Sequence, residues 1–318
     1  METDIRRVVF LRLSVLVILA ACAPINPTAV AVYQNDKLAE VMARGTLIIA
    51  TDANYEPQSK LLENSIPDSN TKCSPAQYTA NQMTGFDVEV AVKVAEHVGM
   101  EPCFVTPPWS QLVAGHWGDN WDIHVGSVAI TAERTESLYF SQPYYATPTV
   151  ILVHEDNKNF KRPEDLSHKR IGVCVGCTFE AYLKGTLDIP GEQVQFRIEK
   201  AEIIGYENEE PAIADLSAGD GVKLDAVLTI LPLAKQALAS GKPIRILNEP
   251  LLFTYASITL DRYGKRDPIR LLSEISNIIS DLHSTGVMRQ LSLQYQEQDL
   301  TQEAARYDIS ALNQLLEP

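Results

Sequence analysis

The residues best placed to do chemistry lie between Gly126 and Tyr145. Thr131 precedes a short predicted helical turn, and its hydroxyl can cap the first backbone N–H groups of that turn. Arg134 follows, where its planar guanidinium can bind a carboxylate through two N–H groups beside those free amides. A lone arginine in such a place is more often paired with a surface acid. The spacing therefore indicates an anion site, provided that the surrounding residues support one.

Other common chemistries find no matching pattern in the chain. It has no Ser-His-Asp order, no histidine cluster with metal-ligand spacing and no glycine-rich phosphate loop. His116 and His124 have no spaced partners, and we interpret both as structural. Cys174 and Cys177 have Cys-x-x-Cys spacing at the start of a predicted helix, where the helix dipole lowers a thiol pKa. We expect binding rather than catalysis, with no cofactor and no metal.

The composition is that of an acidic globular protein. The chain has 318 residues, a formal net charge of −14, 45% hydrophobic residues and 21% charged residues. This length can support two cores, so we expect two lobes. The excess of negative charge argues against nucleic acid as a partner. It does not fix the charge of a ligand, because one buried arginine can dominate a cleft.

The N-terminus has the features of an export signal. Three arginines precede an apolar segment over 13–21 that is too short to span a bilayer. The sequence Leu19-Ala20-Ala21-Cys22 resembles a bacterial lipobox, in which the cysteine thiol receives diacylglycerol. A conventionally cleaved signal with an incidental cysteine is the alternative. We predict a signal peptide over 1–21, a lipidated tether over 22–36 and a membrane anchor on the extracytoplasmic side.

Strands and helices alternate along the rest of the chain, which predicts an α/β fold with a parallel-type sheet. Residues 56–84 are expected to form a long loop rather than a domain. The C-terminal segment 292–318 is expected to wrap the first lobe. The other predicted elements are a buried strand over 46–51, a helix over 86–97, strands over 193–198 and 201–206, and a helix over 267–283 that Asp267 caps.

Four motifs occur in the order typical of one protein family. They closely resemble motifs of the family 3 extracellular solute-binding proteins, which deliver amino acids to ABC transporters, and the resemblance covers about residues 45 to 295. It implies a two-lobe periplasmic-binding-protein-like clamshell, a small carboxylate-bearing solute as ligand and ABC permease subunits as partners. The motifs are Thr131-Ala-Glu-Arg134 with Phe140-Ser141-Gln-Pro143-Tyr144-Tyr145, Gly85-Phe-Asp-Val-Glu89, Asp165-Leu166 with Lys169 to Val173 and Gly176 to Thr178, and Leu216-Ser-Ala-Gly219 with Leu224 to Val227.

The resemblance implies ligand contacts in the first lobe. Asp52 and Tyr55 follow the strand 46–51, and open α/β folds bind ligands beyond the carboxyl ends of their strands. A turn aspartate and a core tyrosine are the alternative. Trp109 is expected to form an aromatic wall, or otherwise to be a core residue. Ser127 is a further expected contact.

The second lobe should supply the other side of the clamp. Thr178 begins a helix, so its hydroxyl and amide could meet the carboxylate that Arg134 holds, although a plain helix cap is the alternative. Thr229 is also expected to contact the ligand. Two hinge crossings place 37–146 and 255–318 in lobe 1 and 147–254 in lobe 2. Such an architecture closes around a small molecule.

One position departs from the family pattern. Relatives that bind α-amino acids usually have an aspartate five residues after that of the Asp-Ala-Val motif, where it pairs with the ligand's ammonium. Here that position is Ile230, and a buried ammonium without an acceptor would be costly. Ala129 also replaces a common serine. Either the ligand lacks the amine, or another acid pairs with it, with Asp52, Glu207 and Glu209 as possibilities.

The cysteines beyond Cys22 suggest two pairs. Cys73 and Cys103 lie on opposite sides of the helix after Gly85, and a disulfide between them would join the preceding loop to the following strand. The resemblance places a ligand-binding loop at Cys174 and Cys177, so a local disulfide or two free thiols is favoured over a redox function. A zinc site is disfavoured because the pairs fall in different lobes.

Two other functions remain open from the sequence. Some clefts of this family have become dehydratases, which need a general acid in the pocket. Ile230 removes the most obvious acid, although Glu207 or Glu209 could replace it. A lipid-anchored sensor that reports ligand occupancy to a partner protein is the third possibility.

Overall fold

The computed structural model describes residues 35–247, 250–309 and 312. The predicted signal peptide over 1–21 and the lipidation residue Cys22 lie outside the described residues, as does nearly all of the tether. At its end, Asp36 is buried, caps the first described helix and pairs with Arg270. Within the described part of the chain, every helix is too short or too polar to span a lipid bilayer.

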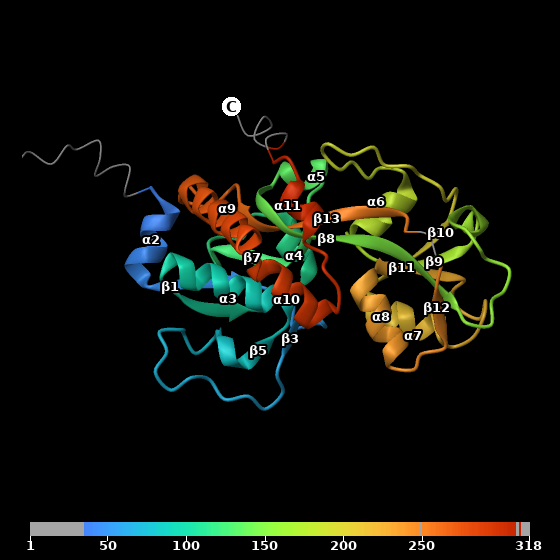
Figure 1. Ribbon diagram of the computed structural model, residues 1–318, viewed down its shortest axis with the longest axis horizontal. Helices are drawn as coiled ribbons and strands as arrows, with labels where there is room; N and C mark the ends of the chain where they lie inside the picture. The colour runs from blue at the N-terminus through green and yellow to red at the C-terminus, as the bar shows by residue number, and fades with distance from the viewer. Residues whose placement is uncertain (1–34, 248–249, 310–311, 313–318) are drawn as a thin grey trace, which may run out of the picture.

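One mixed sheet runs through both lobes (Figure 1). Its strand order is β10-β9-β11-β8-β13-β7-β1-β6-β4, with β12 also paired to β8. The strands are β1 (Thr46–Ala50), β4 (Tyr78–Thr79), β6 (Glu101–Val105), β7 (Ile123–Ala129), β8 (Leu138–His154), β9 (Arg170–Cys174), β10 (Glu202–Tyr206), β11 (Ala226–Ile230), β12 (Ile244–Ile246) and β13 (Leu252–Asp261).

The two longest strands form the hinge. β8 and β13 pair antiparallel along nearly their whole length and carry the chain between the lobes in opposite directions. Away from this shared pairing, β8 also pairs with β11 and β12, and β13 also pairs with β7. The architecture is therefore a two-lobe α/β clamshell. We propose 37–146 with 255–318 as lobe 1 and 147–254 as lobe 2, because β9 to β12 all fall within the latter.

Lobe 1 builds its core from β1, β6 and β7 covered by helices. The helices are α2 (Lys37–Arg44), α3 (Phe86–Val98), α4 (Trp109–Ala114), α5 (Ala132–Thr135), α9 (Ile269–Ser284) and α10 (Val287–Gln296). Leu47, Ile49 and Phe86 are fully buried between the sheet and these helices. Gly85 allows α3 to begin where it does, because a Cβ there would lie 2.3 Å from the carbonyl oxygen of Gln58.

Lobe 2 packs three helices around β9, β10 and β11. They are α6 (Thr178–Lys184), α7 (Glu209–Leu216) and α8 (Leu231–Ala239). β9 pairs in parallel with β10 and β11, as the alternation of elements predicts, but β8, β12 and β13 add antiparallel pairs. The expected parallel-type sheet is thus mixed, because the hinge strands run through it.

The structure corrects three further predictions. Residues 193–198 form no strand, because this segment crosses the surface as a loop and its backbone joins no ladder. Asp267 precedes α9 rather than beginning it, yet its carboxylate still accepts a hydrogen bond from the Ile269 amide at 3.0 Å. The predicted loop over 56–84 contains β3 (Ser59–Leu61) and β5 (Met83–Thr84), which form a small sheet with β2 (Asn54–Tyr55).

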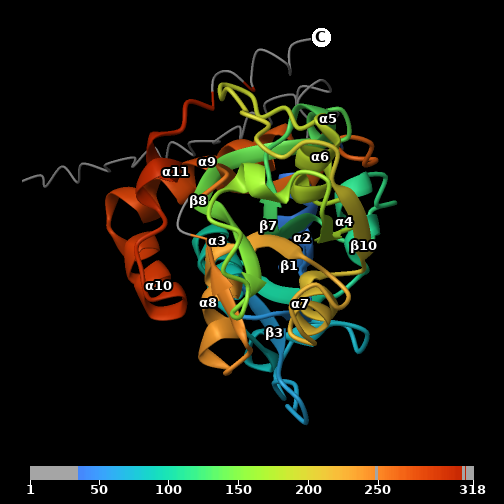
Figure 2. The same cartoon turned by 90° about the vertical axis from the view of Figure 1, so that its right-hand side faces the viewer.

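The C-terminal segment contacts more than lobe 1. In Figure 2, α10 and α11 (Gln302–Arg306) lie along one side of the molecule, next to α9 and β8. Beyond α11, the Tyr307 ring lies 4.6 Å from that of Tyr255 on β13, centroid to centroid. The Tyr307 hydroxyl donates a hydrogen bond to the carbonyl of Pro190 in lobe 2 at 2.9 Å. The chain end therefore links both lobes beside the hinge.

Candidate functional site

A cavity of about 290 Å³ lies between the lobes. Asp52, Tyr55, Trp109 and Ser127 of lobe 1 line it, so the structure brings these four predicted residues together. Lobe 2 contributes Cys174 and Cys177 and the start of α7. The remaining lining residues are Ala53, Asn54, Thr106, Pro107, Pro108, Gly126, Glu207, Asn208 and Glu209.

A buried network holds Ser127 in place. Its hydroxyl donates to Asp87 Oδ2 at 2.7 Å and accepts from the Tyr145 hydroxyl at 2.7 Å. Its backbone N–H donates to the Tyr144 hydroxyl at 2.9 Å, and that hydroxyl donates to Asp87 Oδ1. Ser127 has a φ of 57°, which costs free energy for a residue with a Cβ. The network offsets that cost and fixes the floor of the cavity.

Burial makes Asp87 an unusual carboxyl group. It is fully buried, and desolvation raises its pKa to about 7 although Ser127 and Tyr144 both donate to it. The two motifs that supply this network, Gly85 to Glu89 and Phe140 to Tyr145, were visible in the sequence. That the two motifs together position Ser127 was not predicted, because the contact between Asp87 and Ser127 joins side chains 40 residues apart in the sequence.

Behind the cavity wall lies a neutral histidine. His124 is fully buried, and neither ring nitrogen has a hydrogen-bond partner among the described residues. Burial and the nearby Arg134 cation lower its pKa to about 3. Gly126 leaves room for this ring, since a Cβ there would lie 2.4 Å from His124 Nε2. His124 thus packs against Trp109 and supports the wall without carrying charge.

Arg134 is buried at the junction of the two lobes, with 8% of its surface exposed. Its Nη1 donates to the Ala129 carbonyl at 2.9 Å, and its Nη2 donates to the Gly176 carbonyl in lobe 2 at 3.0 Å. Its guanidinium carbon lies 5.5 Å from the centroid of the Trp109 ring. No acid of the described residues forms an ion pair with it, and burial lowers its pKa to about 10. The cation is therefore held in place by backbone carbonyls, and the exposed Glu133 acts on it electrostatically without forming an ion pair.

Thr178 is brought to Arg134 rather than to the main cavity. Both line a smaller hollow of about 40 Å³, together with Thr131, Gly176 and Cys177. The residue at the cap position of α6 is Cys177, so Thr178 is its first helical residue and not its cap. The hollow and the main cavity share Cys177, which places the expected carboxylate clamp on the far side of the 174–177 loop.

Thr229 is the predicted residue that the structure separates from these hollows. It lies on β11 opposite Val150, fully buried, and its hydroxyl has no hydrogen-bond partner among the described residues. None of the described hollows is lined by it. Ile230, where relatives have an acid, is also buried and continues into α8.

Glu209 gives the main cavity a buried negative group. It begins α7 and has 4% of its surface exposed, and no lysine or arginine of the described residues forms an ion pair with it. Burial, with a smaller contribution from the Asp52 charge, raises its pKa to about 7. Neither lysine nor arginine lines this cavity, whereas Asp52, Glu207 and Glu209 do. A cation entering it would meet carboxylates that have no other counter-ion.

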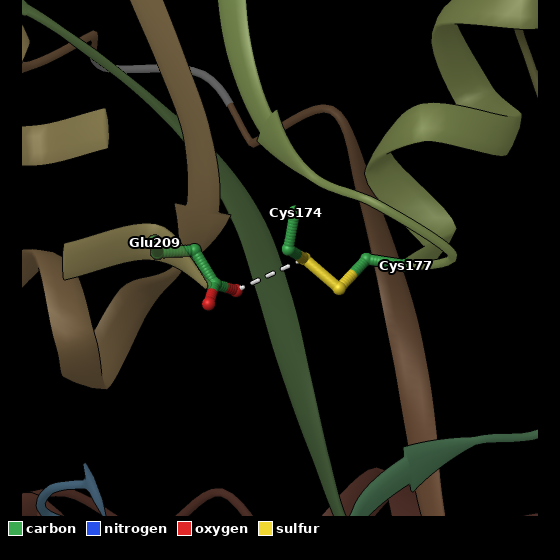
Figure 3. A group of neighbouring side chains, drawn as sticks. All are labelled: Cys174, Cys177 and Glu209. Carbon is green, nitrogen blue, oxygen red and sulfur yellow. Dashed lines mark hydrogen bonds between the residues drawn. A yellow bond between two sulfur atoms is a disulfide. The ribbon is translucent and has the colours of Figure 1, made fainter. Parts of the chain in front are cut away.

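A disulfide joins Cys174 to Cys177 at the wall of the cavity, and a second disulfide joins Cys73 to Cys103 across 30 residues of lobe 1. Figure 3 shows the Glu209 carboxylate directed at the Cys174 sulfur, with 3.5 Å between the closest atoms. The two sulfurs and this carboxylate lie within 4.8 Å of one another, which is compatible with metal ligation. Cysteine sulfur binds zinc as a thiolate, however, and the two sulfurs of this disulfide are not thiolates.

A clamshell of two α/β lobes with a polar cavity at the hinge defines a class of proteins that bind small solutes between their lobes. The model for the bacterial extracellular solute-binding proteins, family 3, matches residues 69–298, and the chain belongs to this family. It is a binding protein rather than an enzyme, as are the named relatives that match most of it.

Several known proteins similar to the chain are named as amino-acid-binding proteins. The probable amino-acid-binding protein YxeM of Bacillus subtilis is 26% identical over 231 residues, covering 72% of this chain and 82% of the relative. The L-cystine-binding protein TcyJ of Escherichia coli is 24% identical over 268 residues, covering 83% and 87%. A cyclohexadienyl dehydratase of Pseudomonas aeruginosa is 26% identical, but over only 52% of this chain.

Solved structures show the same fold. The ancestral amino-acid-binding protein AncCDT-1, described as a precursor of cyclohexadienyl dehydratase, superposes with a TM-score of 0.64 at 26% identity. That match covers 82% of this chain and all of the other. A mutant of ArgBP from T. maritima superposes with a TM-score of 0.64 at 22% identity, covering 81% of this chain and 98% of the other.

Proposed function

We propose that this protein is the extracytoplasmic substrate-binding component of an ABC importer and that it captures a small solute bearing both a carboxylate and an amino group. One observation carries the proposal. Within the described residues, buried Arg134 and buried Glu209 each lack an ion-pair partner, and they flank the same loop between the lobes. Unpaired buried charges are costly, so such a pair favours a ligand that carries the two complementary charges.

The carboxylate of the solute would bind Arg134 beside Thr178. Two of the five guanidinium N–H groups are used by Ala129 and Gly176, which leaves others for a ligand oxygen. The amino group would face Glu209 and Asp52, with Tyr55 and Trp109 as aromatic walls. Glu209 thus takes the place of the acid that relatives have at Ile230. Because Arg134 and Glu209 lie on opposite sides of the 174–177 loop, one amino acid reaches both when the Arg134–Gly176 hydrogen bond opens and the ligand carboxylate replaces the Gly176 carbonyl. A deaminated organic acid would leave Glu209 without a partner.

Transport, rather than sensing, is supported by the relatives. One of them is named as an arginine-binding protein of an ABC transporter, and others are named as amino-acid-binding proteins. Anchoring to the membrane through lipidated Cys22 is part of the same proposal, because it would keep the binding protein close to its permease subunits.

A ligand screen on the purified protein tests the proposal. Thermal unfolding is measured with each standard amino acid and with the deaminated analogue of each. A binder raises the midpoint by an amount that grows with the logarithm of the ratio of its concentration to its Kd. We expect amino acids to raise it and their deaminated analogues to do so far less. A set of hits consisting only of deaminated acids, or of solutes without a carboxylate, would contradict the proposal.

Uptake then separates transport from sensing. Cells that lack this chain should lose accumulation of the labelled hit from dilute solution and regain it when the chain is restored. Unchanged uptake together with a ligand-dependent cellular response would favour a sensor.

A further inference from the structure

The Cys174–Cys177 disulfide has a setting that solute binding does not require. It forms part of the cavity wall, so a molecule in the cavity touches it. The other disulfide, Cys73–Cys103, joins a surface loop to β6 and lines none of the described hollows. One chain therefore contains a disulfide at its binding site and another that only ties its fold together.

The two sulfurs of the cavity disulfide are unequal. Cys174 ends β9 and is 1% exposed. Cys177 is only partly buried and lines the main cavity, the small hollow beside Arg134 and a larger hollow of about 580 Å³ that Arg134 also lines. A solute can thus reach the Cys177 sulfur far more easily than the Cys174 sulfur. Access of this kind decides which sulfur of a disulfide is attacked.

A proton donor lies beside the buried sulfur. The Glu209 carboxyl is 3.5 Å from Cys174 Sγ, on the side away from Cys177 (Figure 3). The charged and titratable groups around it are Asp52, Glu207, Tyr55 and Tyr145. None of them is a cation, and burial with the Asp52 charge raises the pKa of Glu209 to about 7. Near neutral pH this group is therefore protonated in a substantial fraction of molecules.

We propose that the Cys174–Cys177 disulfide is a thiol–disulfide exchange site for low-molecular-weight thiols that enter the cavity. The thiolate of the incoming molecule attacks Cys177 Sγ, so a mixed disulfide forms and the Cys174–Cys177 bond breaks. The electron pair of that bond leaves on Cys174, which takes the proton from the Glu209 carboxyl. A second small thiolate then attacks the sulfur of the first, and Cys177 leaves as a thiolate that takes up a proton from water. The products are the protein dithiol and the disulfide of the small thiol.

Two features favour this direction of attack. A sulfur that leaves as a thiol rather than as a bare thiolate leaves more easily, which is what a neighbouring carboxyl group provides. Cys177 is the partly exposed sulfur of the pair and Cys174 is buried, so an incoming thiolate reaches Cys177 first. The activity goes beyond solute import, and it is measured without any imported solute, so its failure would leave the proposed function intact.

The test compares the two disulfides of one molecule. Oxidised protein is incubated with reduced glutathione without oxygen, quenched with acid, alkylated and analysed peptide by peptide by mass spectrometry. We expect the Cys174–Cys177 pair to open at least about tenfold faster than the Cys73–Cys103 pair, with the first glutathione adduct on Cys177. In guanidinium chloride the difference should disappear. Equal rates in the folded protein, or a first adduct on Cys174, would overturn the proposal.

A matched pair of variants tests the proton donor. The rate constant is divided by the fraction of glutathione present as thiolate, so that only the protein's own titration remains. In the wild type this corrected rate should fall as pH rises through about 7, because Glu209 loses its proton. Glu209→Gln should remove that fall, and Glu210→Gln, an exposed neighbour outside the cavity, should keep it. The same pH profile in Glu209→Gln as in the wild type would refute the assigned role.

Discussion

Arg134 Nη2 donates a hydrogen bond to the Gly176 carbonyl across the cleft, at 3.0 Å. Arg134 belongs to the turn after β7, and Gly176 belongs to the loop between β9 and α6, so this bond joins the two lobes directly. The loop that it holds carries the cavity disulfide and precedes Thr178. Closure of the lobes, the carboxylate site and the cavity wall are therefore coupled through one guanidinium group.

Arg134→Ala should weaken ligand binding by about 2–5 kcal/mol, which is a loss of roughly tens to thousands in affinity. The variant removes a charged contact and leaves the ligand carboxylate unpaired in a closed cleft. Isothermal titration calorimetry with a hit from the ligand screen measures the change. Arg245→Ala is the matched control, because Arg245 also donates to backbone carbonyls, those of Asn157 and Phe160, and lines none of the described hollows. Equal affinity in Arg134→Ala and wild type would remove Arg134 from the site.

Glu209→Gln should weaken binding of an amino acid by about tenfold or more and leave binding of its deaminated analogue nearly unchanged. In the wild type, affinity for the amino acid should rise as pH rises through about 7, because only ionised Glu209 can pair with the ammonium. Titrations in buffers of different ionisation enthalpy should detect the proton that binding releases.

Ile230→Asp provides the opposite test of the same contact. With Glu209 already pairing with the ammonium, a second carboxylate adds repulsion and should not improve affinity for the amino acid. A marked improvement in affinity for the amino acid would show instead that the wild-type cavity has no acid that pairs with the ammonium.

Asp87 should make the protein less stable as pH rises. Its folded pKa of about 7 lies above the ordinary value of 3.8, so between these values the native state holds a proton that the unfolded chain has released. The free energy of unfolding should fall by about 1.4 kcal/mol per pH unit from this one group. Denaturant unfolding at several pH values should give a shallower slope for Asp87→Asn. Asp68→Asn, in an exposed loop, should keep the wild-type slope.

Cys22→Ser tests the lipid anchor. The wild type should incorporate labelled palmitate and sediment with membranes, whereas the variant should do neither and accumulate as precursor or appear in the soluble fraction. Normal processing and membrane retention of Cys22→Ser would show that Leu19-Ala20-Ala21-Cys22 is not a lipobox.

Much of the architecture could be predicted from local pattern. The strand before Asp52, the helix between Gly85 and Gly99 and the helix after Cys177 all follow from hydrophobic periodicity and glycine ends. The absence of a strand over 193–198 could not be predicted, because whether an apolar alternation pairs depends on a free sheet edge. β10 is the end strand of the sheet, and segment 193–198 does not pair with its outer edge, an outcome that tertiary packing decides.

The site was predictable in its residues but less so in their grouping. Asp52, Tyr55, Trp109 and Ser127 share one cavity, whereas Arg134 and Thr178 face a separate hollow and Thr229 faces neither. A sequence motif identifies which residues are expected at the site. Only the packing of the folded chain decides on which side of the 174–177 loop each side chain lies. Asp87 is the clearest case, since its motif was evident and its hydrogen bonds to Ser127 and Tyr144 were not.

The hydrogen bond from Tyr307 to Pro190 opposes wide opening of the two lobes. A hinge made of two strands can bend as far as its backbone allows. Here Tyr307 contacts lobe 2 beside the hinge, while the preceding helix α11 packs on β8. Wide opening of the lobes must either break the Tyr307–Pro190 hydrogen bond or separate Tyr307 from Tyr255. The resting angle of the cleft is thus set partly by residues that never meet the solute, and shortening the C-terminus should tune affinity without altering a single binding contact.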